Sequence, residues 1–197
     1  MISKDREYRM FEVRAQQDTE NEMIVEGYAL TFNQPTCLLE YDGVKYYEQI
    51  DRKALDNADL SDVVMNFNHS GKPVARTRNQ TLTLVVDSIG LKIRAMLGGT
   101  DEGRKLYEEI KGGYIDKMSF AFIYDKNEYD RSSNTNTITG IKRLYDVSAV
   151  DFPAYDTTSI NARSLELFSA EAEKVRSEER KAKIDEVKKK ILLSKLD

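Results

Sequence analysis

The fold is decided by an alternating stretch in the second half of the chain, residues 117–124, which read KMSFAFIY. The bulky side chains of Met118, Phe120 and Phe122 fall on one face of this stretch, and Ser119 falls on the other. A repeat of two residues is typical of a β-strand that packs one face against a core. The stretch therefore predicts a strand whose second face carries a small polar residue.

The same alternation recurs along most of residues 21–151. Further candidate strands span residues 23–32, 63–69, 81–86, 91–97 and 143–150. The segment Asp87-Ser88-Ile89-Gly90 has the composition of a turn, so it predicts a hairpin between 81–86 and 91–97. A set of strands this large suits a closed or nearly closed β-barrel. We therefore predict an α+β fold that is mainly β.

Two short helices and one loop are expected between the strands. Asp51 can cap a helix over residues 52–58, and Thr100 or Asp101 can cap a second helix that ends at Gly112. Residues 127–140 are rich in Asn, Ser and Thr and predict an exposed loop.

The composition changes after Asn161. Fourteen of the twenty residues in 171–190 are charged, with the signs mixed and without Gly or Pro, which favours a solvated helix with a thin apolar stripe. A partly disordered tail and a helix that docks on a partner or is removed by processing both stay open. The chain thus divides into an N-terminal arm (1–19), a main domain (20–163) and a charged helical or disordered tail (164–197).

Composition limits the classes of function. Among 197 residues, the net charge of −4 gives no general electrostatic reason to bind nucleic acid or an anionic membrane. No signal peptide or uninterrupted apolar span is present, so we expect a cytosolic protein. With one histidine and one cysteine, a single chain cannot assemble a zinc site of the usual ligands. We expect no metal and no cofactor.

His69 is the only histidine, so a base with an ordinary pKa near neutrality must be this residue. It ends the predicted strand 63–69 and precedes Ser70-Gly71-Lys72-Pro73, a sequence that suggests a loop at the rim of a site. A partly buried histidine bonded to the backbone is the structural alternative.

Two further residues fit the chemistry of a serine hydrolase. Ser119 is a candidate nucleophile, and the small side chain of Ala121 leaves room for a substrate beside it. Asp146 alternates with apolar residues, and such a carboxylate can orient a histidine. An ordinary strand serine, and a surface aspartate paired with Lys142 or Arg143, are the alternatives.

Other hydrolase types fit less well. The sequence lacks the G-x-S-x-G motif of the α/β hydrolases, and helices do not regularly separate its strands. Cys37 fits poorly as a nucleophile, because its sequence neighbours carry no positive charge that would lower the pKa of the thiol.

The order of several motifs resembles the tailed-bacteriophage prohead (capsid maturation) serine protease family. The resemblance covers about residues 20–165 and lies in these segments: Glu26-Gly27-Tyr28-Ala29, Asn68-His69, Val74-Ala75-Arg76-Thr77, Gly90-Leu91, Met118-Ser119-Phe120-Ala121-Phe122, Asp146-Val147-Ser148 and Pro153-Ala154-Tyr155. It implies a fold similar to the herpesvirus capsid proteases (assemblins), a β-barrel with peripheral helices.

The resemblance also implies roles. His69 would be the general base, Ser119 the nucleophile and Asp146 the residue that orients the histidine; many family members carry Glu at the last position. Arg76 matches a family position near the histidine, where it would help polarise the scissile carbonyl, and an ordinary surface ion pair is its alternative.

A protease of this kind would cleave scaffold or the scaffolding segment of the major capsid protein, and itself, inside the prohead in the bacterial host cytoplasm. The charged tail would tether it to scaffold or be a region of self-cleavage. Similarity to the herpesvirus enzymes suggests that the protein forms a homo-oligomer, such as a dimer. Two alternatives stay open: a noncatalytic capsid-assembly or scaffolding protein that associates through the tail, and a small-ligand binding barrel.

Overall fold

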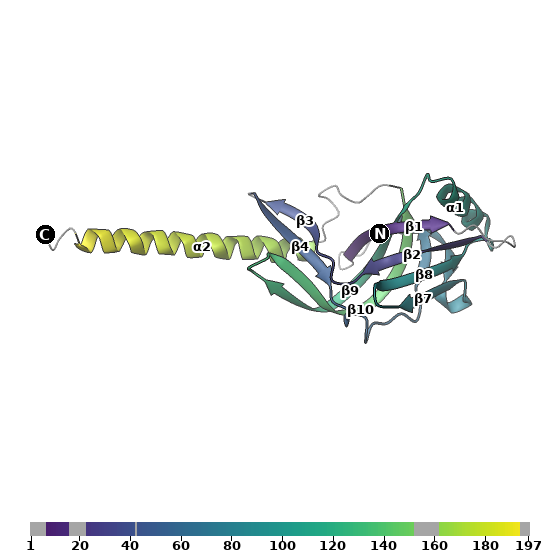
Figure 1. Ribbon diagram of the computed structural model, residues 1–197, viewed down its shortest axis with the longest axis horizontal. Helices are drawn as coiled ribbons and strands as arrows, with labels where there is room; N and C mark the ends of the chain where they lie inside the picture. Colours follow the sequence, from purple (N-terminus) through teal and green to yellow (C-terminus); the bar gives the residue numbers. More distant parts are fainter. Residues whose placement is uncertain (1–6, 16–22, 42, 152–161, 194–197) are drawn as a thin grey trace. The chain divides into compact units, whose positions relative to one another are not determined.

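The computed structural model describes residues 7–15, 23–41, 43–151 and 162–193. The chain separates into two compact units, Met1–Asn161 and Ala162–Asp197. The described part of the first unit is a curled β-sheet with one α-helix, and the second unit contains a long helix (Figure 1).

Within the described residues, the sheet of the first unit contains ten strands, in the order β3-β4-β10-β9-β1-β2-β8-β7, with β5 pairing with β10 and β6. Their bounds are β1 Glu7–Ala15, β2 Ile24–Thr31, β3 Thr36–Tyr41, β4 Val44–Ile50, β5 Val64–Phe67, β6 Ser70–Arg76, β7 Leu82–Val86, β8 Gly90–Met96, β9 Lys117–Asp130 and β10 Thr135–Val150. β6 and β7 also contact each other, so the sheet curls into a half-barrel. The mainly-β prediction is confirmed.

The core follows from the alternation in β9. Met118, Phe120 and Phe122 are fully buried and pack in one cluster with residues of β10 such as Val147 and Ala149. Burying each of these large side chains stabilises the fold by about 1.5–3 kcal/mol. The strand predicted from residues 117–124 is therefore present, and its apolar face belongs to the core.

Two other local predictions are confirmed. The hairpin of β7 and β8 forms as an antiparallel pair. Helix α1 (Asp101–Lys111) begins with Thr100 as its cap, because Thr100 Oγ1 accepts a hydrogen bond of 2.9 Å from Gly103 N. The helix ends before Gly112, and its buried side is formed by Leu106, Tyr107 and Ile110. A single 3₁₀ turn, η1 (Thr77–Asn79), follows β6.

The predicted loop at residues 127–140 is wrong, because β9 and β10 continue through this region as one long hairpin. Its turn is held by the carboxylate of Asp130, whose Oδ1 accepts hydrogen bonds of 2.8 Å from both Ser132 N and Ser132 Oγ. Residues 135–138 of β10 pair with β4, and the β-branched Thr135, Thr137 and Ile138 suit such a strand.

The helix predicted at residues 52–58 is also wrong, since this segment forms consecutive turns. Asp51 does cap the first turn, with Lys53 N at 2.8 Å from its Oδ1. However, the Ala54 carbonyl accepts a hydrogen bond from Ile141 N of β10 at 2.7 Å, and Asp51 N donates to Ile138 O at 2.9 Å. The Ala54 carbonyl, which a helix over 52–58 would bond to Ala58 N, is thus bonded to β10 instead.

The structure changes two further expectations. Residues 1–19, expected to be an arm, contain β1, which lies between β9 and β2 in the sheet. The segment Ser70-Gly71-Lys72-Pro73, expected to be a loop, is the first half of β6. Consequently β5 and β6 form a tight hairpin, with Asn68 and His69 as its turn.

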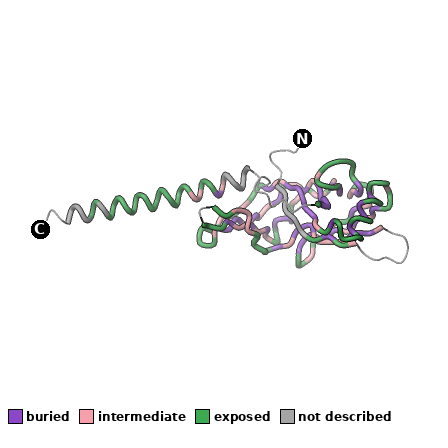
Figure 2. Tube along the Cα trace, turned by 90° about the horizontal axis from the view of Figure 1, so that it is seen from above, coloured by how far each residue is buried: buried purple, intermediate pink, exposed green. Residues whose placement is uncertain are grey.

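The second unit contains helix α2 (Ala162–Leu193). Most of its described side chains are exposed (Figure 2), and some form ion pairs one turn apart, such as Lys174 Nζ with Glu171 Oε1 at 2.6 Å. This exposure fits the mixed charges of the sequence. Within the described residues, no helix is long and apolar enough to span a membrane.

Candidate active site

A row of polar side chains crosses three strands of the sheet. Ser119 of β9 pairs with Ser148 of β10, and Ser148 pairs with Asn66 of β5. Side chains of paired residues lie on the same side of a sheet, about 4.5–5.5 Å apart. All three residues are buried. They lie on the opposite face from Met118 and Phe120, so the core and the polar row use alternate residues of the same strands.

Next to this row, Asp146 forms a close contact with His69. The Nδ1 atom of the imidazole lies 2.6 Å from Oδ1 of the carboxylate, and the two side chains are only 14% and 6% exposed. The alternative of a surface Asp146 paired with Arg143 is not observed, because Asp146 is buried and Arg143 pairs with Asp59 at 3.6 Å. A histidine held through Nδ1 has Nε2 as the nitrogen that can accept a proton.

The β5–β6 turn fixes the backbone of His69. Asn68 and His69 have φ angles of 50° and 53°, in the left-handed region that two-residue hairpin turns require. Asn68 N donates to Ala149 O at 2.9 Å, and Asn68 Oδ1 accepts from Asp151 N at 3.3 Å. Positive φ is uncommon outside glycine, although Asn and His adopt it more often than most residues, and such conformations cluster at functional sites. The turn is therefore anchored to β10 beside the Asp146 carboxylate.

Ser119 is the exception in this polar region. Its hydroxyl is the one buried side-chain polar atom without a hydrogen-bond partner in the described part of the chain, and the residue is 1% exposed. Leaving a buried hydroxyl unpaired costs about 1–3 kcal/mol. Ala121 is also fully buried, so the space expected beside Ser119 is closed in this conformation.

The structure places two of the three predicted residues in direct contact and the third nearby on a neighbouring strand. His69 and Asp146 are in direct contact. Ser119 is joined to them by strand register, because its neighbour Ser148 donates a hydrogen bond of 2.8 Å to Asp146 Oδ1. No hydrogen bond links Ser119 to His69 among the residues described. Catalytic hydrogen bonds often shorten only when substrate is bound.

Arg76 forms the ion pair that was its alternative role. Its Nε and Nη2 atoms donate to the two carboxylate oxygens of Asp62 at 2.6 and 2.7 Å. The hydrogen bonds from Arg76 lower the pKa of Asp62, and the pKa of Arg76 is raised by the same contact. A guanidinium held in this bidentate geometry joins β6 to the segment before β5.

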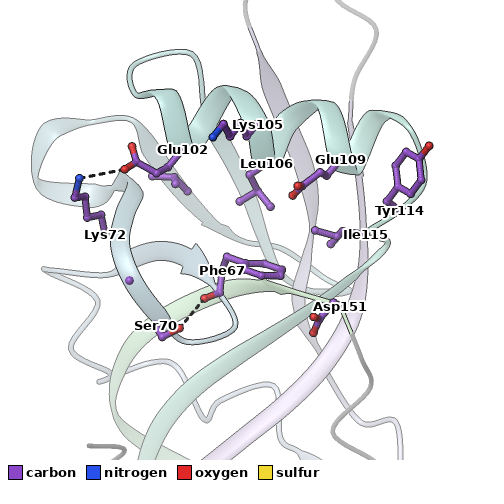
Figure 3. Close-up of a pocket in the computed structure, with 12 residues that line it drawn as sticks. Phe67, Ser70, Lys72, Glu102, Lys105, Leu106, Glu109, Tyr114, Ile115 and Asp151 are labelled. Carbon is purple, nitrogen blue, oxygen red and sulfur yellow. Dashed lines mark hydrogen bonds and ion pairs between the residues drawn. The ribbon is translucent and has the colours of Figure 1, made fainter.

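A pocket adjoins the His69 turn, between α1 and the β5–β6 hairpin (Figure 3). Phe67, Leu106 and Ile115 form its apolar centre. At one end Lys72 Nζ donates to Glu102 Oε1 at 3.1 Å. Because Phe67 and Ser70 flank the turn, the pocket begins within two residues of His69.

Sequence reasoning gave no role to Ser148 or Asn66. A signal for Ser148 is its spacing of two residues from Asp146, which puts both side chains on one face of a strand. Asn66 has no comparable signal, because only the parallel pairing of β5 with β10 brings it to Ser148. Among the described residues, no cluster of His, Cys, Asp and Glu side chains is suited to a metal ion. Cys37 lies on β3, at one end of the strand order.

Comparison with known proteins gives one family. A family model described as caudovirus prohead serine protease matches residues 9–174. A search of curated proteins found no match. Among solved structures, the capsid assembly protease gp21 of bacteriophage T4 is similar, with 12% sequence identity and a TM-score of 0.46 over 76% of this chain and 99% of that chain. Because the family model covers most of its length, this chain belongs to the caudovirus prohead serine protease family.

Proposed function

We propose that Ser119, His69 and Asp146 are the catalytic triad of this prohead serine protease. The observation that carries the proposal is the 2.6 Å contact between His69 Nδ1 and the buried Asp146 carboxylate. It supplies a base and the residue that orients it, which a serine nucleophile requires. Ser119 is the serine that the strand register supports as their partner, since it lies across from Ser148.

In this mechanism, Ser119 Oγ attacks the carbonyl carbon of the scissile peptide bond while His69 Nε2 accepts the hydroxyl proton. The tetrahedral intermediate collapses, the C–N bond breaks, and the imidazolium donates its proton to the leaving amine. A water molecule then attacks the acyl carbon while His69 Nε2 accepts a proton from it. The ester bond to Ser119 Oγ breaks, His69 returns the proton to Ser119 Oγ, and the carboxylic acid product leaves. Asp146 keeps the Nδ1–H tautomer throughout, so that Nε2 faces the reaction.

The burial of Ser119 adds a requirement. At 1% exposure, its hydroxyl is not accessible to a peptide in the conformation described. Peptide binding or assembly must therefore uncover it. A protease that acts within an assembling particle benefits from such a resting state, because premature cleavage would remove scaffold before the shell is complete.

A prohead protease acts inside the procapsid, and its substrate is a capsid or scaffold protein. We propose more specifically that this chain cleaves scaffold or the scaffolding segment of the major capsid protein, and also itself. The pocket at Phe67, Leu106 and Ile115 suits an apolar substrate side chain close to the cleaved bond. Replacing Phe67 by Ala should raise KM for the capsid substrate more than it lowers kcat.

The tail at residues 164–197 is proposed to tether the protease to scaffold or to be a self-cleavage region. Its charged, exposed helix supports a role in association rather than in the core. A variant lacking these residues should fail either to enter proheads or to process itself normally. Normal entry together with normal self-processing would contradict the role.

The triad is tested by producing the full chain together with its capsid and scaffold proteins, and measuring intact masses. Wild type is compared with Ser119→Ala and with the control Ser88→Ala, which changes an exposed serine in the β7–β8 turn. Shortening of the capsid protein or the protease in wild type and Ser88→Ala, but not in Ser119→Ala, is expected. Equal masses in all three samples would instead favour a noncatalytic assembly protein.

A further inference from the structure

Behind the His69–Asp146 contact lies a buried serine that touches the same carboxylate oxygen as the histidine. Ser148 Oγ is 2.8 Å from Asp146 Oδ1, and it also lies within hydrogen-bonding distance of Asn66 Oδ1. Ser148 is fully buried and Asn66 is 8% exposed. Polar groups at this depth need partners, because water is not there to replace a lost hydrogen bond.

A count of hydrogens decides how these groups can bond. A serine hydroxyl has a single hydrogen, and an ionised carboxylate can only accept. With the amide oxygen of Asn66 facing Ser148, one hydrogen would have to serve two acceptors. Turning the Asn66 amide by about 180° puts Nδ2–H, a donor, in the same position without moving the rest of the side chain. This orientation pairs each donor with an acceptor.

On these grounds we infer that Asn66 and Ser148 are positioning residues for the proposed triad. Asn66 Nδ2–H donates to Ser148 Oγ, Ser148 O–H donates to Asp146 Oδ1, and Asp146 Oδ1 also accepts from His69 Nδ1–H. The chain of hydrogen bonds keeps the carboxylate from rotating away from the imidazole. The inference rests on the proposed roles of His69 and Asp146.

The strands make this arrangement rigid. Asp146 and Ser148 are two residues apart on β10, and Asn66 is fixed opposite Ser148 by the parallel pairing of β5 with β10. β5 also leads directly into the turn that carries His69. The same short strand therefore supplies a support for the carboxylate and the backbone of the base, which links the positions of the two catalytic groups.

The test uses the full-length protein assembled with its capsid and scaffold proteins, the condition in which Ser119 must become accessible, and a fluorophosphonate probe, which reacts with an activated serine. The rate of labelling at Ser119 is measured by mass spectrometry for wild type, Asp146→Asn, Ser148→Ala, Ser148→Thr and Asn66→Ala. Ser148→Ala and Asn66→Ala should each react about 10- to 100-fold more slowly than wild type, the loss expected when a catalytic group is misplaced by about 1 Å. Ser148→Thr, which keeps the hydroxyl, should recover most of the rate.

A second readout, made on the purified full-length protein, separates positioning from a general loss of structure. Because His69 is the only histidine, its Nδ1 proton gives a single imidazole signal in the ¹H NMR spectrum. This signal should broaden in Ser148→Ala and Asn66→Ala, as the proton exchanges faster with water, and return in Ser148→Thr. The control Thr137→Ala removes another hydrogen-bonded hydroxyl from β10, 3.0 Å from Gln49 Nε2, and should leave both the signal and the labelling rate unchanged.

The outcomes distinguish this inference from the triad itself. If Asp146→Asn is slow but Ser148→Ala and Asn66→Ala react like wild type, the positioning role is excluded and the triad stands. If Asp146→Asn reacts like wild type, or if the probe does not modify Ser119, the triad fails and the inference fails with it. Should Ser148→Ala not fold, Asn66→Ala and Ser148→Thr decide the question with the same two measurements.

Discussion

The hairpins β5–β6 and β7–β8 use the side chains of their turns in opposite ways. In the β7–β8 turn, Asp87 Oδ1 accepts hydrogen bonds from Ile89 N at 2.7 Å and Gly90 N at 3.0 Å, and Asp87 Oδ2 accepts one from the Tyr28 hydroxyl of β2. In the β5–β6 turn, Asn68 and His69 both bond to residues of the β10 region. The Asp87 side chain stabilises its own turn, whereas the side chains of the β5–β6 turn bond to the strand that carries Asp146, where they can position a catalytic group.

The largest effect is expected from removing the imidazole. His69→Gln should lower the rate of fluorophosphonate labelling at Ser119 by about 10⁴-fold, the scale on which serine proteases depend on a correctly oriented base. The matched control is Ile89→Gln, at an exposed position of the other turn, which should react like wild type. A labelling rate within tenfold of wild type for His69→Gln would show that another group is the base.

The next largest effect concerns the backbone of the β5–β6 turn. Asn68 has a φ of 50°, which asparagine tolerates and a β-branched residue does not. Asn68→Val should therefore lower the free energy of unfolding by about 1–2 kcal/mol, measured by urea denaturation. Asn68→Gly should change it less, because glycine adopts this φ freely. Equal losses in the two variants would mean that the side-chain contact, not the backbone angle, is what matters.

A smaller effect is expected at the β7–β8 turn. Asp87→Ala removes the acceptor of two backbone N–H groups and of the Tyr28 hydroxyl, which lies 2.7 Å from Asp87 Oδ2. The urea midpoint of unfolding should fall, while the labelling rate at Ser119 stays that of wild type. A loss of labelling in the folded variant would remove the distinction between the two turns.

The smallest effect is a dependence on pH. Hydrogen bonds from Gly90 N, then from Tyr28 and Ile89 N, lower the pKa of Asp87 in the folded protein. Its carboxylate therefore stabilises the fold above the unfolded pKa of about 3.9, and this contribution is lost as the pH falls through the lower, folded pKa. Between about pH 5 and pH 2, the urea midpoint of Asp87→Asn should fall less steeply than that of wild type. Parallel curves would assign the acid sensitivity to other carboxylates.

Elements whose bonds are local were predictable from sequence. The β7–β8 hairpin follows from the alternation of its strands and from the turn residues Asp87-Ser88-Ile89-Gly90. Helix α1 follows from the Thr100 cap and from Gly112 at its end. Prediction failed where backbone groups bond to a distant strand. The turns at 52–58 bond to β10 in place of a helix, and the polar residues 127–140 become strands because β10 there has β4 as a neighbour.

The residues of the candidate site also fall into two groups, those that the sequence predicted and those that it did not. Its members His69, Ser119 and Asp146 were identified from uniqueness, alternation and resemblance to a family. Their supports, Ser148 and Asn66, were not, because an asparagine in a short apolar strand has many ordinary explanations. The ion pair of Arg76 with Asp62 also depends on where β6 lies relative to the segment before β5.

By itself, the sequence determined which face of the predicted strands is apolar, where the chain reverses between β7 and β8, and how few residues can act as a base. These properties arise from a period of two residues, from turn chemistry and from composition, all of which act over short distances along the chain. Only the tertiary structure decided that His69 meets Asp146, 77 residues away, and that Ser148 touches the same carboxylate. Such contacts depend on the register between β5, β10 and β9, which is set by the burial of the whole sheet rather than by any one segment.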